Sequence, residues 1–515
     1  MGSSTVARYA VANYLRLGVT AASQLLLIPA VIRHLGSEAY GLYALVVSAL
    51  GLCALLEFGA GVGALKAVAR AGEAEDREAH GARNATLSTL LVVTVGIGLV
   101  VLGVLLALLP SAPALLRVPA ARQDEARALL LLLGLRAAVL PWPLGVFRSA
   151  LVGRGDVALA NGVQAAAALL YAVAGLVLLP RGLGLVGFGA LSLAGFLAEH
   201  AAYVALCWRR IPSLRLSPRL FERSRLRDAV ALGGAQTLVS LSGILLLRTD
   251  PLIVGWRLSL EAVAVYAVAL KVAEQGLVVV KQFANALPPV VAALDRRGDR
   301  AGLGRLLVDG SRLSLLPAGL VGLPLLCFGG DLLALWVGPS FAAAGPALAV
   351  LTLAMVLTAP QMVFTSLFTY TGRYAWTGRV AALAAAVNLA ASLALVGPLG
   401  LVGVSLGSLV AVVLVDLLYA GSLAARAHEV SRTRLFVHGL GRPMLAALVA
   451  AAVAPGLGAL LPTAGWASLI AKGVLLDLAF LLAFALVAVR PAERARALAR
   501  IARAWPRARV ARAAA

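Results

Sequence analysis

The stretch Leu246–Ala269, LLRTDPLIVGWRLSLEAVAVYAVA, contains two apolar runs separated by a short break. The first run carries Arg248, Asp250 and Pro251, and the second begins near Glu261. Each run belongs to an apolar segment of the length that spans a bilayer, which takes about 20 residues. The break therefore predicts a turn between two membrane helices.

The same turn occurs near the N-terminus. There Leu35-x-x-Glu38-Ala39-x-x-x-Tyr43-Ala44 matches Leu258-x-x-Glu261-Ala262-x-x-x-Tyr266-Ala267 at an offset of 223 residues. Two further matches follow in the same order, at offsets of 219 and 216 residues. Three ordered matches with nearly constant offset predict an internal duplication.

The composition requires a lipid environment. Of the 515 residues, 61% are hydrophobic and 13% are charged, and the mean hydropathy is +0.94. So few polar residues cannot cover a water-soluble globule. We expect an all-α polytopic membrane protein with about 14 transmembrane helices. The predicted spans are 10–32, 40–64, 85–109, 128–147, 157–179, 183–207, 229–255, 261–283, 310–330, 345–370, 379–397, 400–424, 443–461 and 468–489.

The distribution of basic residues predicts the orientation. Of 45 Lys and Arg residues, 34 fall on the side that holds both termini, in loops or at the ends of spans, six on the opposite side and five deeper inside spans. Cytoplasmic loops of membrane proteins retain Lys and Arg, so both termini should be cytoplasmic. The same rule explains the net charge of +22 without a nucleic-acid partner.

Six predicted spans separate the two copies of the turn, so both halves should have the same orientation in the membrane. The predicted organisation has five parts. They are an N-terminal lobe of six spans (1–207), a basic cytoplasmic linker (208–228), a C-terminal lobe of six spans (229–424), an extra helix pair (443–489) and a basic cytoplasmic tail (490–515).

Four stretches carry a family resemblance: Leu35–Tyr43, Leu56–Gly59, Asp250–Gly255 and Glu261–Tyr266. With them, the sequence resembles the Wzx-type oligosaccharide and polysaccharide flippases of the multidrug/oligosaccharidyl-lipid/polysaccharide exporter superfamily over roughly residues 10–425. The resemblance implies two helical bundles around a central cavity, lined largely by spans one, two, seven and eight, which opens alternately to each side.

The resemblance also implies a function. Such proteins, in the bacterial cytoplasmic (inner) membrane, move undecaprenyl-pyrophosphate-linked oligosaccharide repeat units to the outer leaflet for surface polysaccharide biosynthesis. H⁺ or Na⁺ is the implied coupling ion, and a polysaccharide polymerase complex is an implied partner. Two alternatives in the same superfamily stay open: a lipid II flippase, and a multidrug/cation antiporter.

Ionisable residues inside spans are the candidate site residues, because a charge facing lipid is costly. Six of them lie on the four spans that the resemblance places around the cavity. The substrate-binding candidates are Arg16, Arg248 and Lys271, and the coupling or cavity acids are Glu57, Asp250 and Glu274. The planar fork of Arg suits a pyrophosphate.

Each candidate also has a structural explanation. Either arginine could neutralise a nearby carboxylate or reach the membrane interface with its charged end. Lys271 and Glu274 are three residues apart on one predicted helix and could pair with each other.

No catalytic function is predicted. The sequence has no nucleotide-binding or His-Glu-x-x-His motif and no soluble domain that could house an active site. Cys53, Cys207 and Cys327 lie in apolar runs, without metal-ligand spacing. We therefore expect a transporter without a metal or other cofactor, and not a polymerase or ligase.

Overall fold

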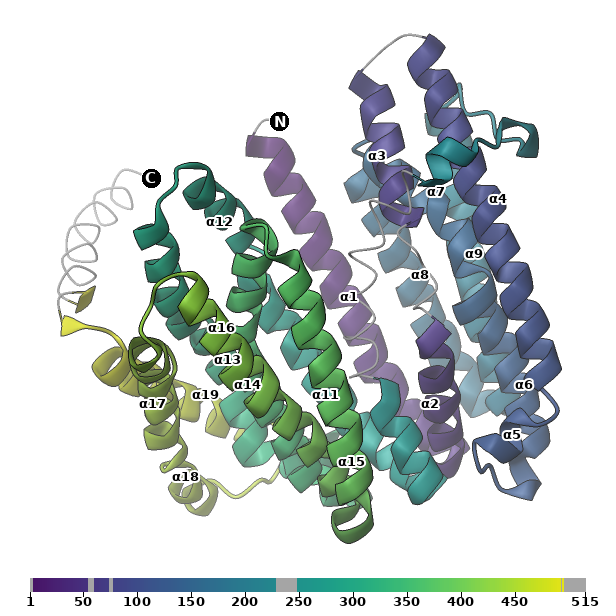
Figure 1. The fold of residues 1–515 in the computed structure, drawn as a ribbon. Helices are drawn as coiled ribbons and strands as arrows, with labels where there is room; N and C mark the ends of the chain where they lie inside the picture. The colour runs from purple at the N-terminus through teal and green to yellow at the C-terminus, as the bar shows by residue number, and fades with distance from the viewer. Residues whose placement is uncertain (1–2, 54–59, 74–76, 228–247, 492, 495–515) are drawn as a thin grey trace, which may run out of the picture. The chain divides into compact units, whose positions relative to one another are not determined.

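The computed structural model describes residues 3–53, 60–73, 77–227, 248–491 and 493–494. These residues form helices and turns, with no strand among them (Figure 1). Eleven of their helices are long and apolar enough to cross a membrane. The predicted all-α polytopic membrane fold is confirmed.

The difference between eleven helices and fourteen predicted spans has local causes. Predicted spans 40–64 and 229–255 both include residues outside the described ranges. Predicted spans 379–397 and 400–424 form one continuous helical stretch, Tyr374–Ala427. That stretch kinks at Gly400, where φ is 58°, a conformation that glycine adopts without steric penalty. The kink lies where the sequence predicts the boundary between two spans.

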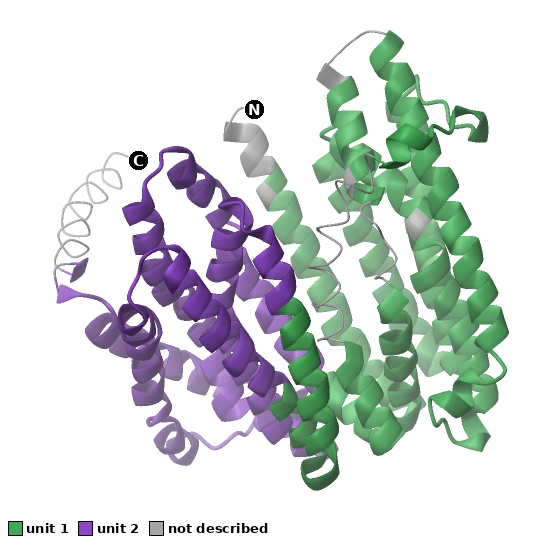
Figure 2. Ribbon diagram, in the orientation of Figure 1, with its two compact units in different colours: residues 1–268, 381–407 green, residues 269–380, 408–515 purple. Residues whose placement is uncertain are grey.

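The chain divides into two compact units (Figure 2). Unit 1 comprises residues 1–268 and 381–407, and unit 2 comprises residues 269–380 and 408–515. These units follow spatial contacts, whereas the predicted lobes follow the sequence repeat. The lobes therefore stay a prediction.

Unit 1 holds the N-terminal helices. They are α1 (Ser3–Leu35), α2 (Ser37–Gly51), α3 (Ala60–Glu73), α4 (Arg77–Leu108), α5 (Ala112–Leu115), α6 (Gln123–Gly134), α7 (Pro141–Gly153), α8 (Val157–Leu178) and α9 (Leu185–Arg210). Between α6 and α7, residues Leu135–Val139 form a π-helical turn. A core that includes Leu87, Phe147 and Tyr203 joins α4, α7 and α9, while Leu99 and Leu170 are exposed as expected of lipid-facing side chains.

In both copies of the repeated turn, one helix ends and another begins. Gly36 separates α1 from α2, with φ at 88°. In the second copy, residues 248–257 are helical, the helix breaks at Leu258 and Ser259, and α11 (Leu260–Ala284) follows. Glu38 and Glu261 occupy the first turn of their helices, where a carboxylate is favoured by the helix dipole.

The two copies contact each other within unit 1. A Cβ added to Gly41 would lie 1.8 Å from the carbonyl oxygen of Leu260, and one added to Gly255 would lie 2.7 Å from Leu45 Cδ1. At the other end of α2, a Cβ on Gly51 would lie 2.9 Å from Arg248 Cδ. Along α2 the contacting residue numbers rise while those of 248–260 fall, so the two segments pack antiparallel. A glycine at each of the three contacts allows the close approach.

The predicted basic linker is tied to α4 over its described part, which ends at residue 227. Arg83 Nη2 and Asn84 Nδ2 each donate to the carbonyl oxygen of Ser213, at 2.9 Å. Further along, the Glu222 amide donates to Thr89 Oγ1 at 2.9 Å. These hydrogen bonds hold the linker against the start of α4 instead of leaving it solvated throughout.

Unit 2 holds the remaining helices. Besides the second part of α11, they are α12 (Leu287–Arg296), α13 (Arg300–Trp336), α14 (Gly345–Tyr370), α15 (Tyr374–Ala411, whose middle belongs to unit 1), α16 (Ala420–Ala427), α17 (Arg442–Ala451), α18 (Ala454–Leu460) and α19 (Trp466–Ala483). π-helical turns lie at Val412–Tyr419 (η7), Arg434–Gly441 (η8) and Phe484–Ala488 (η9).

The extra helix pair of the sequence prediction packs on α13. Phe480 of α19 lies against Gly319, where a Cβ would come within 2.4 Å of its ring. About two turns earlier on α19, the buried Lys472 donates to Asp331 at 2.9 Å and lies 4.7 Å from the Phe328 ring centroid. The pair is therefore an integral part of unit 2.

Candidate substrate-recognition site

Arg16 lies on α1, which packs along α8. Its guanidinium donates from Nη2 to Asn13 Oδ1 at 3.0 Å and from Nη1 to Gln164 Oε1 at 3.3 Å. Both acceptors are neutral amides, and the described residues place no carboxylate within ion-pair distance of Arg16. The alternative that Arg16 neutralises a carboxylate is therefore not what the described structure shows.

Arg148 joins Arg16 at the same acceptor. Its Nη2 lies 3.5 Å from Gln164 Oε1, so two guanidinium groups from α1 and α7 converge on one amide oxygen of α8. Arg148 is not among the candidates predicted from the sequence, because the predicted span ends at residue 147 and Arg148 follows it. Helix α7 continues to Gly153, which places Arg148 inside the bundle.

The three converging residues lie at similar depth along their helices. Arg16 follows the start of its candidate span at Val11, Arg148 precedes the end of α7, and Gln164 follows the start of α8 at Val157. At a rise of 1.5 Å per residue, Arg148 and Gln164 are about 8–11 Å from their helix ends on that side, and Arg16 is about 8 Å from the start of its candidate span, although α1 itself begins earlier, at Ser3. The cluster is thus inside the candidate spans but near one face of them.

Two donors of this cluster lack a partner. Within the described part of the chain, Nε of Arg16 and Nε of Arg148 are both buried without a hydrogen bond. A buried unsatisfied donor costs about 1–3 kcal/mol, and more when it is charged. Two neighbouring guanidinium groups also repel each other. An anion between them would satisfy the donors and relieve the repulsion.

A third helix, α9, adds polar groups to the same cluster. The hydroxyl of the fully buried Tyr203 donates to Glu199 Oε1 at 2.9 Å, and lies close enough to Arg16 and Arg148 to interact electrostatically. Beside it, His200 Nδ1 lies 2.9 Å from the Phe196 carbonyl oxygen. The hydroxyl leaves Glu199 charged, so the cluster holds two guanidinium groups and one carboxylate, an excess of positive charge.

The other candidates in unit 1 lie on the segment that packs against α2. Arg248 extends its side chain along Gly51, and the described residues give its guanidinium no ion pair. Asp250 is buried and accepts a hydrogen bond from Tyr266 at 2.7 Å. No hydrogen bond or ion pair among the described residues joins Arg248 to Arg16, so the two substrate-binding candidates are not brought into contact.

The candidates in unit 2 pair with each other. Lys271 Nζ donates to Glu274 Oε2 at 3.0 Å, as their spacing on one helix allows. Each charge therefore has a partner without a ligand. Glu57, the remaining candidate, lies outside the described residues. Among the described residues, no group of three or more His, Cys, Asp and Glu could hold a metal ion.

Solved structures share this fold. An inward-facing multidrug resistance MATE family transporter of the MOP superfamily aligns with a TM-score of 0.67 and 19% identity, covering 81% of this chain and 98% of that one. The lipid II flippase MurJ, in an inward closed conformation, aligns with a TM-score of 0.71 and 12% identity, covering 93% and 98%. No curated protein gives a significant match.

The described helices define a multi-pass membrane protein with the fold of these two transporters. The sequence also matches a family model described as polysaccharide biosynthesis protein, over residues 11–294. That match covers more than half of the 515-residue chain, and the chain belongs to this family. The relationship to polysaccharide biosynthesis proteins that the sequence resemblance predicts is confirmed.

Proposed function

We propose that this protein is a flippase that moves undecaprenyl-pyrophosphate-linked oligosaccharides from the cytoplasmic to the outer leaflet of the bacterial inner membrane. Its substrate would serve surface polysaccharide biosynthesis, in keeping with the description of its family. The observation that carries the proposal is the convergence of Arg16 and Arg148 on Gln164.

The chemistry of the arginine pair favours a pyrophosphate ligand. Each guanidinium can donate two parallel hydrogen bonds to phosphate oxygens, and Arg keeps its charge when it is partly desolvated. Two such groups, each with a buried unpartnered Nε, match the two charged phosphates of a pyrophosphate. Exchange of the neutral Gln164 oxygen for an anionic one would strengthen every contact.

The same pair disfavours a cationic drug as the substrate. A cation near Arg16 and Arg148 would meet two like charges in a low-dielectric region, where repulsion is strong. An antiporter for cations would need acidic groups free to bind them. Glu274 is paired with Lys271, whereas Glu199 and Asp250 accept from the hydroxyls of Tyr203 and Tyr266 and keep their charge. It is therefore the two arginines that disfavour a cation. Lipid II also contains a pyrophosphate, so the arginine pair does not distinguish lipid II from other lipid-linked oligosaccharides. An experiment with both substrates distinguishes them.

In the proposed cycle, both termini are cytoplasmic and the arginine pair lies near the cytoplasmic face. The pair would bind the pyrophosphate in the inward-open state and release it when the carrier opens outward. A ligand drives such a change only through different affinities for the two states. H⁺ or Na⁺ is the proposed coupling ion, and a polysaccharide polymerase complex is the proposed partner that receives the product.

Complementation of a strain that lacks its polysaccharide flippase tests this proposal. Arg16→Gln and Arg148→Gln should each reduce surface polysaccharide, and the double variant should lower it at least about tenfold, because hydrogen bonds to charged groups are worth about 1.5–3 kcal/mol. Arg→Lys at either position should have an intermediate effect, since it keeps the charge and loses the fork.

The matched control is Arg181→Gln, which removes an exposed arginine of the same unit. Membrane expression of every variant is quantified alongside, so that loss of protein is separated from loss of transport. Normal surface polysaccharide in the double variant, at normal expression, would refute the assignment of the arginine pair.

A further inference from the structure

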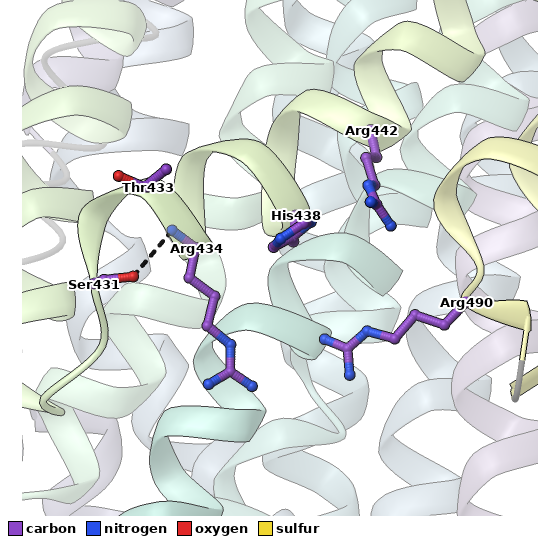
Figure 3. Close-up of a pocket in the computed structure, with 6 residues that line it drawn as sticks. All are labelled: Ser431, Thr433, Arg434, His438, Arg442 and Arg490. Atoms are coloured by element: carbon purple, nitrogen blue, oxygen red, sulfur yellow. Dashed lines mark hydrogen bonds between the residues drawn. The ribbon is translucent and has the colours of Figure 1, made fainter.

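A second basic site lies in unit 2, apart from the candidate substrate cluster. A pocket of about 560 Å³ there is lined by Ser431, Thr433, Arg434, His438, Arg442 and Arg490, and Figure 3 shows how these side chains lie. Its volume is in the range of small-molecule sites. None of the six lining residues is acidic, so the pocket is suited to an anion.

The local helix geometry explains why the basic residues gather there. Arg434, His438 and Arg442 are four residues apart along η8 and the start of α17. This spacing places side chains on one face of a helix. Arg490 enters the same space from the segment after η9 (Figure 3). The two segments that frame the pocket are thus the beginning and the end of the extra helix pair.

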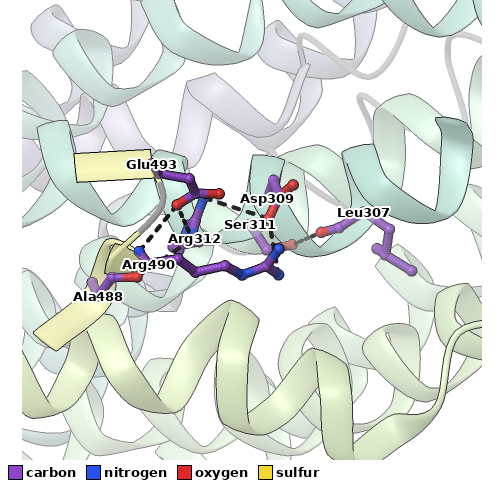
Figure 4. Close-up of polar contacts among 7 residues, drawn as sticks. All are labelled: Leu307, Asp309, Ser311, Arg312, Ala488, Arg490 and Glu493. Atoms are coloured by element: carbon purple, nitrogen blue, oxygen red, sulfur yellow. Dashed lines mark hydrogen bonds and ion pairs between the residues drawn. The ribbon is translucent and has the colours of Figure 1, made fainter. Parts of the chain in front are cut away.

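The acidic residues nearby are already engaged with other arginines. The buried Arg312 of α13 pairs with Glu493 at 2.9 Å and with Asp309 at 3.5 Å, while Arg490 lies 3.7 Å from Asp309 (Figure 4). Burial alone would raise the pKa of Glu493, but the hydrogen bonds from Arg312 and the Arg490 amide outweigh it and lower the pKa. Glu493 therefore stays ionised and bound.

Counting charges across this region leaves an excess of positive charge. Four arginines (Arg312, Arg434, Arg442 and Arg490) face two carboxylates (Asp309 and Glu493). Among the described residues, Arg434 and Arg442 have no ion pair. Residues 494–515 contain no Asp or Glu.

We propose that this pocket binds the phosphate of an anionic membrane lipid. Three guanidinium groups and two hydroxyl side chains are the donors that recognise phosphate oxygens. Val437, Leu445 and Leu486 are exposed within about two turns of the lining arginines, and they offer an apolar surface for acyl chains. A basic pocket beside membrane helices is a typical headgroup site. A free phosphate would use the same donors but would not need the apolar surface.

Lipid retention by the purified full-length protein tests the proposal. Native mass spectrometry would follow titration with phosphatidylglycerol, with phosphatidylcholine as the zwitterionic reference, and separately with inorganic pyrophosphate as the soluble anion. The wild type should retain phosphatidylglycerol preferentially, and Arg434→Gln/Arg442→Gln should bind it at least about tenfold more weakly. The matched control is Arg426→Gln/Arg432→Gln, which removes two exposed arginines outside the pocket.

Each outcome of this experiment either supports or overturns the proposed lipid site. Loss of phosphatidylglycerol in the pocket variant, with normal retention in the control variant, supports the lipid site. Equal retention in the pocket and control variants overturns it. Pyrophosphate binding that depends on Arg434 and Arg442, without phosphatidylglycerol preference, overturns the lipid as the source and leaves a site for a soluble anion. Neither variant changes Arg16 or Arg148, so this test is independent of the proposed transport function.

Discussion

Gly41 and Leu260 belong to the two copies of one repeated turn, and their backbones lie so close that a Cβ on Gly41 would be 1.8 Å from the Leu260 carbonyl oxygen. The segments therefore meet through glycine, with backbone against backbone.

The first prediction concerns this contact. Gly41→Ala should destabilise the folded protein by about 1–3 kcal/mol, because the new methyl group overlaps a backbone atom that a side-chain rotation cannot move. Thermal unfolding in detergent measures the effect. Gly18→Ala is the control, since a Cβ there meets nothing within 4 Å. Equal melting temperatures for the two variants would contradict the close contact.

The second prediction concerns Lys271 and Glu274. Because they pair at 3.0 Å, either single change to Gln should leave one charge uncompensated inside the membrane and lower expression. The double change Lys271→Gln/Glu274→Gln should restore both expression and complementation. If expression recovers but transport does not, Lys271 or Glu274 acts on the substrate or on the coupling ion, as the sequence analysis predicted.

The third prediction is a pH dependence at His428, which follows α16. Burial and the nearby Arg373 lower its pKa to about 4, although Asp295 acts in the opposite direction. The folded protein thus favours neutral imidazole, whereas the unfolded chain has a pKa near about 6.5. The contribution of neutral His428 to the stability of the folded protein is therefore fully present above the unfolded-state pKa of about 6.5. It is lost as the pH falls toward 4, because protonation of His428 favours the unfolded chain.

A melting-temperature series between pH 7 and pH 4 checks the His428 prediction. His428→Gln lacks the titrating group, so its melting temperature should fall less steeply than that of the wild type over this interval. Parallel curves for the two proteins would show that His428 does not contribute to the acid sensitivity.

The fourth prediction concerns orientation. Reporter fusions after Arg77, Arg219, Arg300 and Arg432 should report the cytoplasm, and fusions near Ser37, Arg122 and Gly465 should report the outside. The reason is the retention of basic residues in cytoplasmic loops. Two or more reversed fusions would be incompatible with the predicted orientation.

Much of the fold was predictable because lipid imposes a simple pattern on the sequence. Apolar runs gave the helices, and the repeated turn placed the helix breaks near Gly36 and Leu258. The kink at Gly400 also coincides with a predicted boundary. The length of the apolar runs and the positions of their breaks predict the helices and the helix ends, and both can be recognised in the sequence without knowledge of tertiary contacts.

The site was only partly predictable. Arg16 was recognised because a charge inside an apolar run is conspicuous, and the Lys271–Glu274 pair because its spacing is local. Arg148 was missed, since it lies beyond the apolar run and only the packing of α7 brings it to Gln164. One signal was present in the sequence: the turn-forming residues Gly153, Gly155 and Asp156 come only after Arg148, in agreement with the end of α7 at Gly153.

The most direct test of the account is transport by the purified protein in liposomes. A fluorescent undecaprenyl-pyrophosphate-linked oligosaccharide reports movement between leaflets, and a lipophilic cation serves as the competing substrate. We expect the wild type to move the pyrophosphate lipid and not the cation, and Arg16→Gln/Arg148→Gln to slow that movement at least about tenfold. Movement of the cation without the pyrophosphate lipid, or equal rates for the wild type and the double variant, would contradict the central claim.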